Sequence, residues 1–81
     1  MKLNVQLFAR ARDLAGSGVV EVELPEAARV ADLRAALGEH YPQLRPLLPS
    51  LHVALGNDYA SDETVIDPNA QIACFPPVSG G

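Results

Sequence analysis

The sequence predicts a small α+β roll in which a mixed β-sheet carries one main helix packed across one face. Two stretches near the N-terminus alternate apolar and polar residues, the period of a half-buried strand, whereas residues 30–41 repeat apolar residues at every third or fourth position. Short alternating stretches follow the helix, so the element order is that of a ββαβ-type roll. With 81 residues the chain cannot fill a second core, and we expect a single domain.

The first two strands are predicted from their alternation. In residues 2–9, leucine and valine occupy positions 3, 5 and 7 and point to one face, whereas Phe8 points to the other. Residues 10–18 contain two glycines and other turn formers, so we expect them to connect an antiparallel hairpin. The second strand covers residues 19–24 and is closed by Pro25.

Residues 30–41 are predicted to form the main helix. Asp32 lies in its first turn, where a negative charge complements the helix dipole, and Pro42 ends it. Residues 43–49 contain apolar residues interrupted by prolines, which indicates a connector rather than an element. The apolar face of the helix consists of Val30, Leu33, Leu37 and Tyr41.

The C-terminal half predicts a hairpin and a last strand. Residues 51–55 alternate as a third strand, Gly56-Asn57-Asp58 forms a tight turn, and residues 59–60 begin a short return strand. Residues 61–69 are rich in turn formers. The last strand covers residues 71–75.

Composition excludes several classes of function. The formal net charge is −4, with one lysine and five arginines, and no concentrated positive footprint for nucleic acid or an anionic membrane is visible. An acidic surface instead favours a basic protein partner. The N-terminus has no long apolar run, so we expect neither signal peptide nor membrane span, and a cytoplasmic protein. Cys74 is the only cysteine, which excludes an internal disulfide and a cysteine-based zinc site.

The chain divides into a folded body, residues 1–75, and a flexible C-terminal tail, residues 76–81. The two prolines that open the tail stiffen its exit from the last strand, because proline fixes φ and restricts the preceding residue. The two terminal glycines lack Cβ atoms, so they can thread a narrow channel. This shape suits delivery of a terminal carboxylate into the active site of another protein. The tail reads Pro76, Pro77, Val78, Ser79, Gly80 and Gly81.

Four segments give the chain a resemblance to a known family along its whole length. They are Leu7-Phe8-Ala9, Arg12-Asp13-Leu14-Ala15-Gly16, Val30-Ala31-Asp32-Leu33 and Phe75-Pro76-Pro77-Val78-Ser79-Gly80-Gly81. Together they resemble the molybdopterin synthase small-subunit (MoaD-like) family, within the sulfur-carrier and ubiquitin-like β-grasp superfamily. The terminal motif is the specific one. The chain departs from the family pattern at Arg29, where threonine is frequent, and at Pro68-Asn69, where Gly-Asp is frequent.

The resemblance implies a β-grasp fold and a role as a sulfur carrier. A ubiquitin-activating-type adenylyltransferase, using its own ATP and magnesium, would adenylate the Gly81 carboxylate, and a sulfur donor protein would convert it into a thiocarboxylate. Gly80 would help to thread the tail into the large subunit of molybdopterin synthase, where sulfur passes to cyclic pyranopterin monophosphate in molybdenum cofactor biosynthesis. The family assembles as a heterotetramer, and the chain itself binds no cofactor or metal.

Three alternatives remain open from sequence. The same tail could serve a sulfur carrier for thiazole, cysteine or tRNA thiolation, or a ubiquitin-like protein modifier, or it could be incidental to an interaction module. No catalytic serine, cysteine and histidine set occurs at recognisable spacing, so we expect no activity from the chain alone.

Candidate partner-binding residues lie on the predicted sheet and in the tail. If positions 3, 5 and 7 face the helix, Phe8 and Phe75 should lie side by side on the opposite face of parallel neighbouring strands, unless they are ordinary core. Arg12 either pairs with an acidic site on the activating enzyme or is a solvated arginine. Cys74 either holds a persulfide or, as its inward position favours, is an inert buried thiol. The full set is Phe8, Arg12, Tyr59, Phe75, Pro76, Pro77, Val78 and Ser79.

The two histidines, His40 and His52, have no second ligand or nucleophile at useful spacing. We therefore expect both to be structural or solvent-exposed.

Overall fold

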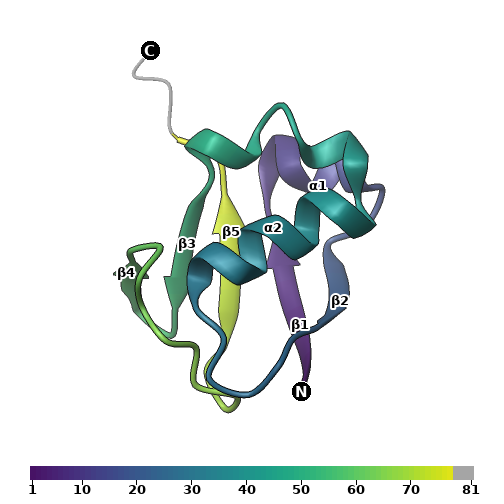
Figure 1. The fold of residues 1–81 in the computed structure, drawn as a ribbon. Coiled ribbons are helices and arrows are strands. Elements are labelled where there is room, and N and C mark those ends of the chain that lie inside the picture. The colour runs from purple at the N-terminus through teal and green to yellow at the C-terminus, as the bar shows by residue number, and fades with distance from the viewer. Residues whose placement is uncertain (78–81) are drawn as a thin grey trace.

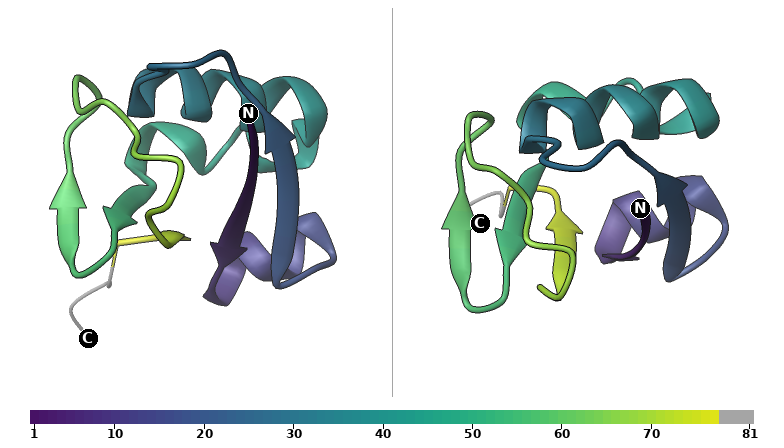
Figure 2. Two further views of the ribbon diagram at one scale, coloured as in Figure 1. Left: turned by 90° about the horizontal axis from the view of Figure 1, so that it is seen from below. Right: turned by 60° about the horizontal axis from the view of Figure 1, so that its bottom comes forward.

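The structure is a computed structural model that describes residues 1–77. A mixed five-stranded sheet is covered on one face by the main helix and two short 3-10 turns, whereas a second helix joins the first two strands at one end of the sheet (Figures 1 and 2). The α+β β-grasp roll is confirmed. The elements are β1 Lys2–Leu7, α1 Ala9–Ala15, β2 Val19–Glu23, α2 Val30–His40, η1 Pro42–Leu44, η2 Leu48–Ser50, β3 His52–Leu55, β4 Asp58–Ala60 and β5 Ile72–Phe75.

The strand order is β2-β1-β5-β3-β4, so the first and last strands lie next to each other near the middle of the sheet. β1 and β5 run parallel, with Val5 opposite Ile72 and Leu7 opposite Cys74. The pairs β1–β2, β3–β4 and β3–β5 are antiparallel. The pairing of β1 with β5 places the strand before the tail between two neighbours.

One hydrophobic core fills the space between α2 and the sheet. β1 alternates exposed and buried residues, and its buried side chains meet Val30, Leu33 and Leu37 of α2, all with no exposed surface. Tyr41, the fourth residue of the predicted apolar face, is half-buried and follows the last residue of α2. Burial of this apolar surface is the main favourable contribution to folding.

Residues 10–18 are not the simple turn that the sequence predicts, because α1 occupies Ala9–Ala15. The segment is rich in alanine and arginine, both good helix formers, and its glycines stand only at the end. Gly16 adopts a left-handed φ of 77° and donates its N–H to the carbonyl of Arg12 at 2.9 Å, which ends the helix. The first strand consequently stops at Leu7 rather than at residue 9, and Phe8 becomes the N-cap residue of α1.

The start of α2 explains how Arg29 replaces the threonine that is frequent in related sequences. The Asp32 carboxylate accepts a hydrogen bond from the backbone N–H of Arg29 at 2.8 Å, so the cap comes from within the helix. The other departure, at Pro68-Asn69, also has a local solution. Asp67 Oδ1 accepts the N–H of Asn69 at 2.8 Å, which forms the turn before β5.

Arg34 connects α2 to η2 and to the segment that follows β4. Its guanidinium donates to the carbonyls of Leu48 and Leu51, the latter at 2.8 Å, and pairs with the exposed carboxylate of Asp62 at 3.0 Å. One charged side chain therefore satisfies the carbonyl of the first residue of η2 and the carbonyl of the residue that follows η2.

Arg34→Met is expected to lower the free energy of unfolding by about 1–3 kcal/mol, because both carbonyls lose a charged donor in a partly buried place. Asp62→Asn removes only the exposed ion pair and should cost about 0–1 kcal/mol. Urea denaturation of both variants measures the difference, and equal losses would contradict this account.

Candidate functional site at the carboxyl end of β5

Three rings gather on the outer face of the sheet, where β3, β4 and β5 lie together. Ring centroids are 5.5 Å apart for Tyr59 and Phe75, 5.6 Å for His52 and Tyr59, and 6.1 Å for His52 and Phe75. His52 and Phe75 are direct cross-strand partners. These tilted pairs fall in the distance range in which aromatic side chains attract one another. We call His52, Tyr59 and Phe75 the aromatic surface.

The aromatic surface is accessible to a partner and precedes the tail directly. Tyr59 is 73% exposed, His52 is exposed and Phe75 is half-buried. Pro76 is half-buried and Pro77 is exposed, so the chain leaves β5 next to these rings. The predicted tail residues Val78, Ser79, Gly80 and Gly81 lie outside the described residues.

Phe8 follows the last residue of β1 and is the N-cap residue of α1. It is 46% exposed and keeps an extended backbone, and its N–H donates to the carbonyl of Cys74 at 3.1 Å. It lines a shallow recess of about 260 Å³ together with Arg12 and Val19. The ring neighbours of Phe75 in the described chain are those of the aromatic surface. Within residues 1–77 the ring of Phe8 forms no aromatic pair with the ring of Phe75, and a docking surface shared by the two stays a prediction.

Arg12 lies on the exposed side of α1. Its aliphatic stem packs near Gly18, where an added Cβ would come within 3.5 Å of the Arg12 side chain. Within residues 1–77 its guanidinium has no carboxylate partner, since the ion pair found there is that of Arg34. Pairing of Arg12 with an acidic site on another protein stays a prediction.

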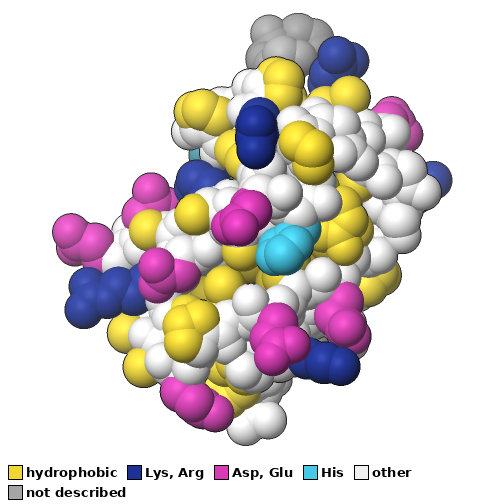
Figure 3. Space-filling model, turned by 45° about the vertical axis from the view of Figure 1, so that its right-hand side comes forward, with side chains coloured by type: hydrophobic (Ala, Val, Ile, Leu, Met, Phe, Trp, Pro, Cys, Tyr) yellow, Lys and Arg dark blue, Asp and Glu magenta, His cyan; other side chains and the backbone are white. Residues whose placement is uncertain are grey.

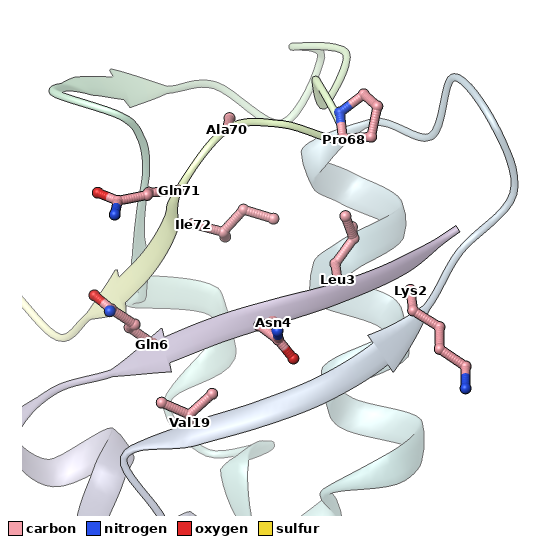
Figure 4. Close-up of a pocket in the computed structure, with 9 residues that line it drawn as sticks. All are labelled: Lys2, Leu3, Asn4, Gln6, Val19, Pro68, Ala70, Gln71 and Ile72. Atoms are coloured by element: carbon pink, nitrogen blue, oxygen red, sulfur yellow. The ribbon is translucent and has the colours of Figure 1, made fainter.

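A recess of about 420 Å³ opens on the sheet beside β1 (Figure 4). The pairing of β1 with β5 begins only at Val5 and Ile72, so the segments before these two residues are not paired with each other. The polar side chains that line the recess are Lys2, Asn4, Gln6 and Gln71. No carboxylate, histidine or cysteine lines this recess, and the amine of Lys2 is its one titratable side-chain group.

Three further findings concern the surface charge, the metal ligands and the helix hydropathy of the described residues. On the face shown in Figure 3, lysine and arginine side chains are separated by acidic and apolar ones. Within residues 1–77, no three histidine, cysteine, aspartate or glutamate side chains are grouped to hold a metal ion. No helix in that range has the length and apolar character to span a membrane.

The sequence profile of the ThiS family matches residues 5–81, which includes the second half of β1, the aromatic surface and the terminal glycines. The chain belongs to the ThiS family.

Curated relatives of this ThiS-family chain match it from end to end. "Molybdopterin synthase sulfur carrier subunit" is the name of a Chlamydomonas reinhardtii protein that is 30% identical, with 100% of each chain covered. An Arabidopsis thaliana protein of the same name is 28% identical over 100% of this chain and 84% of its own length.

Solved structures agree on the fold. SAMP1 from Haloferax volcanii is 28% identical and superposes with a TM-score of 0.86 over 100% of both chains. A putative molybdopterin converting factor subunit 1 from Pyrococcus furiosus is 30% identical, with a TM-score of 0.83 over 96% of this chain and 99% of that one. A Helicobacter pylori complex of subunits 1 and 2 of molybdopterin-converting factor contains a chain that is 22% identical, covered fully in both directions, with a TM-score of 0.69.

Sequence reasoning missed His52 as a member of the aromatic surface. The alternation of β3 does predict that His52 points to the outer face, because the next residue, Val53, is buried on the inner face. Its partners Tyr59 and Phe75 are set by the registers of β3 with β4 and β5, which no local pattern specifies. His40, by contrast, is an exposed residue at the end of α2.

Cys74 is fully buried in the ThiS-family core, as its alternation with Phe75 predicts. Burial raises the pKa of its thiol from 9.0 to about 12, and the positive charge of Arg34 opposes this only in part. A neutral, inaccessible thiol is a poor nucleophile, so the structure favours the inert role for Cys74 over a persulfide.

The raised pKa of Cys74 predicts a pH-dependent loss of stability. From pH 9.0 to about 12 the unfolded chain releases the thiol proton while the folded chain keeps it, so unfolding becomes easier as pH rises. The thiol thus lowers the free energy of unfolding by up to about 1.4 kcal/mol per pH unit, and this pH dependence is absent from Cys74→Ala. Urea denaturation should show the stability gap between wild type and variant narrowing from about pH 8 to about pH 10.5. A constant gap would contradict a buried neutral thiol.

Proposed function

We propose that this chain is the sulfur carrier subunit of a molybdopterin synthase and that the carboxylate of Gly81 is its reacting group. The observation that carries the proposal is the family match, which runs through the last glycine, together with full-length relatives that bear this name.

The proposed loading reaction needs two partner proteins. An adenylyltransferase that supplies ATP and magnesium lets a Gly81 carboxylate oxygen attack the α-phosphorus of ATP, and pyrophosphate leaves. A sulfur donor protein then supplies sulfide sulfur to the acyl carbon, with AMP as the leaving group, which gives the thiocarboxylate. Adenylation is required because a free carboxylate oxygen is a poor leaving group.

Delivery of the sulfur depends on docking. The aromatic surface provides apolar area beside the point where the tail begins, so binding there would bring the thiocarboxylate into the active site of the large subunit. Holding two reactants together in this way supplies much of the rate gain of a bimolecular step. The large subunit would supply acid, base and electrostatic stabilisation while cyclic pyranopterin monophosphate accepts the sulfur. Two copies of each subunit are the stoichiometry we propose.

A ubiquitin-like modifier is the second candidate function, and it is less favoured than the carrier, because the full-length curated relatives are named sulfur carrier subunits. The Haloferax volcanii structures include small archaeal modifier protein 1, which is 27% identical with a TM-score of 0.84 over 95% of this chain and 98% of that one. A ubiquitin-like modifier would use the same adenylated Gly81, with a lysine amine attacking the acyl carbon instead of sulfur.

Deletion of Gly81, or addition of one alanine after it, should abolish sulfur loading without changing the melting temperature. Intact mass spectrometry after incubation with the activating enzyme, ATP and a sulfur donor should show oxygen-to-sulfur replacement in the wild type only. Conjugates of higher mass would indicate the modifier instead. Full loading of the extended variant would refute the role of Gly81.

Phe75→Ala should weaken binding of the large subunit by about 1–4 kcal/mol if Phe75 anchors the interface. Val65→Ala is a matched control, because Val65 is a 51% exposed apolar side chain on the segment that joins β4 to β5. Calorimetric titration measures the affinities and thermal melts monitor the fold. Unchanged affinity together with a lower melting temperature would show that Phe75 serves only the fold.

A further inference from the structure

The two free edges of the sheet, β2 and β4, differ in how their outward main-chain groups are satisfied. In β2, Leu7 N–H donates to Gly18 O and Leu24 N–H to Met1 O, so the odd-numbered residues of β2 direct their main-chain groups away from β1. Side-chain hydroxyls meet these groups. Ser17 Oγ donates to Val19 O at 2.8 Å and accepts Val19 N–H at 3.3 Å, and Tyr41 OH donates to Glu21 O at 3.2 Å. The β2 edge is therefore partly closed to another strand.

The β4 edge is open by the same reasoning. Gly56 N–H donates to Gln71 O at 2.8 Å, so Ala54 bonds toward β5 and its neighbours in β3 bond toward β4. Tyr59 lies opposite Ala54, so its N–H and C=O point away from β3. Within residues 1–77 no side chain or backbone group bonds to them. β4 is also the outermost strand on its side of the molecule (Figures 1 and 2).

The net charge of the protein resides in the half of the chain that contains β4. Residues 1–45 hold six acidic and six basic residues, whereas residues 46–81 hold four acidic residues and no lysine or arginine. All four lie on β4 or between β4 and β5, and two of their carboxylates are engaged. Asp62 pairs with Arg34, and Asp67 accepts the N–H of Asn69. Asp58 and Glu63 are exposed, and their carboxylates make no hydrogen bond or ion pair within residues 1–77.

We propose that the β4 edge receives an extended, basic segment of the large subunit as an added strand. This rests on the proposed function, since the same partner covers the aromatic surface. Three observations select this occupant. Tyr59 offers a main-chain donor and acceptor, and its ring makes the edge continuous with the aromatic surface. Asp58 before it and Glu63 after it in the chain carry exposed carboxylates that have no partner within residues 1–77. Main-chain bonds give strand addition its affinity, and the carboxylates select lysine or arginine in the added strand.

Charge reversal tests the electrostatic part with a matched control. Asp58→Lys with Glu63→Lys should raise the Kd for the large subunit about tenfold at low salt and reduce its salt dependence. Glu21→Lys with Glu23→Lys makes the same change in net charge at the β2 edge, and its Kd should stay within about twofold of wild type. If both double variants raise the Kd equally, the net charge alone explains the effect and the proposal is overturned.

Substitutions of Tyr59 test the main-chain part. Tyr59→Ala removes the ring and keeps the N–H, whereas Tyr59→Pro also removes the outward N–H, at an edge position where proline is tolerated. The proline variant should bind about tenfold more weakly than the alanine variant, because a buried acceptor on the partner loses its donor. Equal Kd values for two variants with equal melting temperatures would overturn strand addition. If the proline variant melts lower, hydrogen exchange in the wild-type complex decides: slowed exchange of Tyr59 N–H supports the proposal, and unchanged exchange overturns it.

Failure of this inference is separable from failure of the proposed function. A wild-type protein that gains sulfur at Gly81 and binds the large subunit, while its β4 variants bind equally well, keeps its function and loses only the added strand. A wild-type protein that neither gains sulfur nor binds the large subunit loses both.

Discussion

The parallel pairing of β1 with β5 is the constraint on which the rest of this structure depends. It joins the first strand of the chain to the strand that precedes the tail, with Val5 opposite Ile72, and places β5 between two neighbours instead of at an edge. Cys74 is then fully buried and Phe75 faces outward beside β3 and β4. The base from which the tail leaves is thus held by hydrogen bonds on both sides and by the core beneath it.

The two faces of the sheet have separate tasks. The inner face packs against α2 and contains apolar side chains together with one neutral thiol, so it contributes stability and no chemistry. The outer face presents the aromatic surface and a recess beside β1 whose polar lining consists of Lys2 and three amide side chains. A carrier has no use for its own catalytic pocket, because its partners supply the reaction environment.

The two edges of the sheet differ in how their outward main-chain groups are satisfied. Hydroxyls of Ser17 and Tyr41 meet outward groups of β2, which limits unwanted pairing, whereas the short β4 strand keeps the groups of Tyr59 free. Within residues 1–77 the carboxylates of Asp58 and Glu63 have no partner. Aromatic contact area and outward main-chain groups therefore lie together on the side of the sheet formed by β3 and β4.

The sequence alone determined the roll, the main helix and the inward position of Cys74, because each follows from a local period of two or of about 3.6 residues. The terminal glycines also stand out without a structure, although the family match rather than their geometry supports their role. Tertiary structure decided which rings meet. Strand registers brought His52 to Phe75, and the helix at residues 9–15 ended the first strand at Leu7. These outcomes depend on pairings between distant segments, about which a local pattern carries no information.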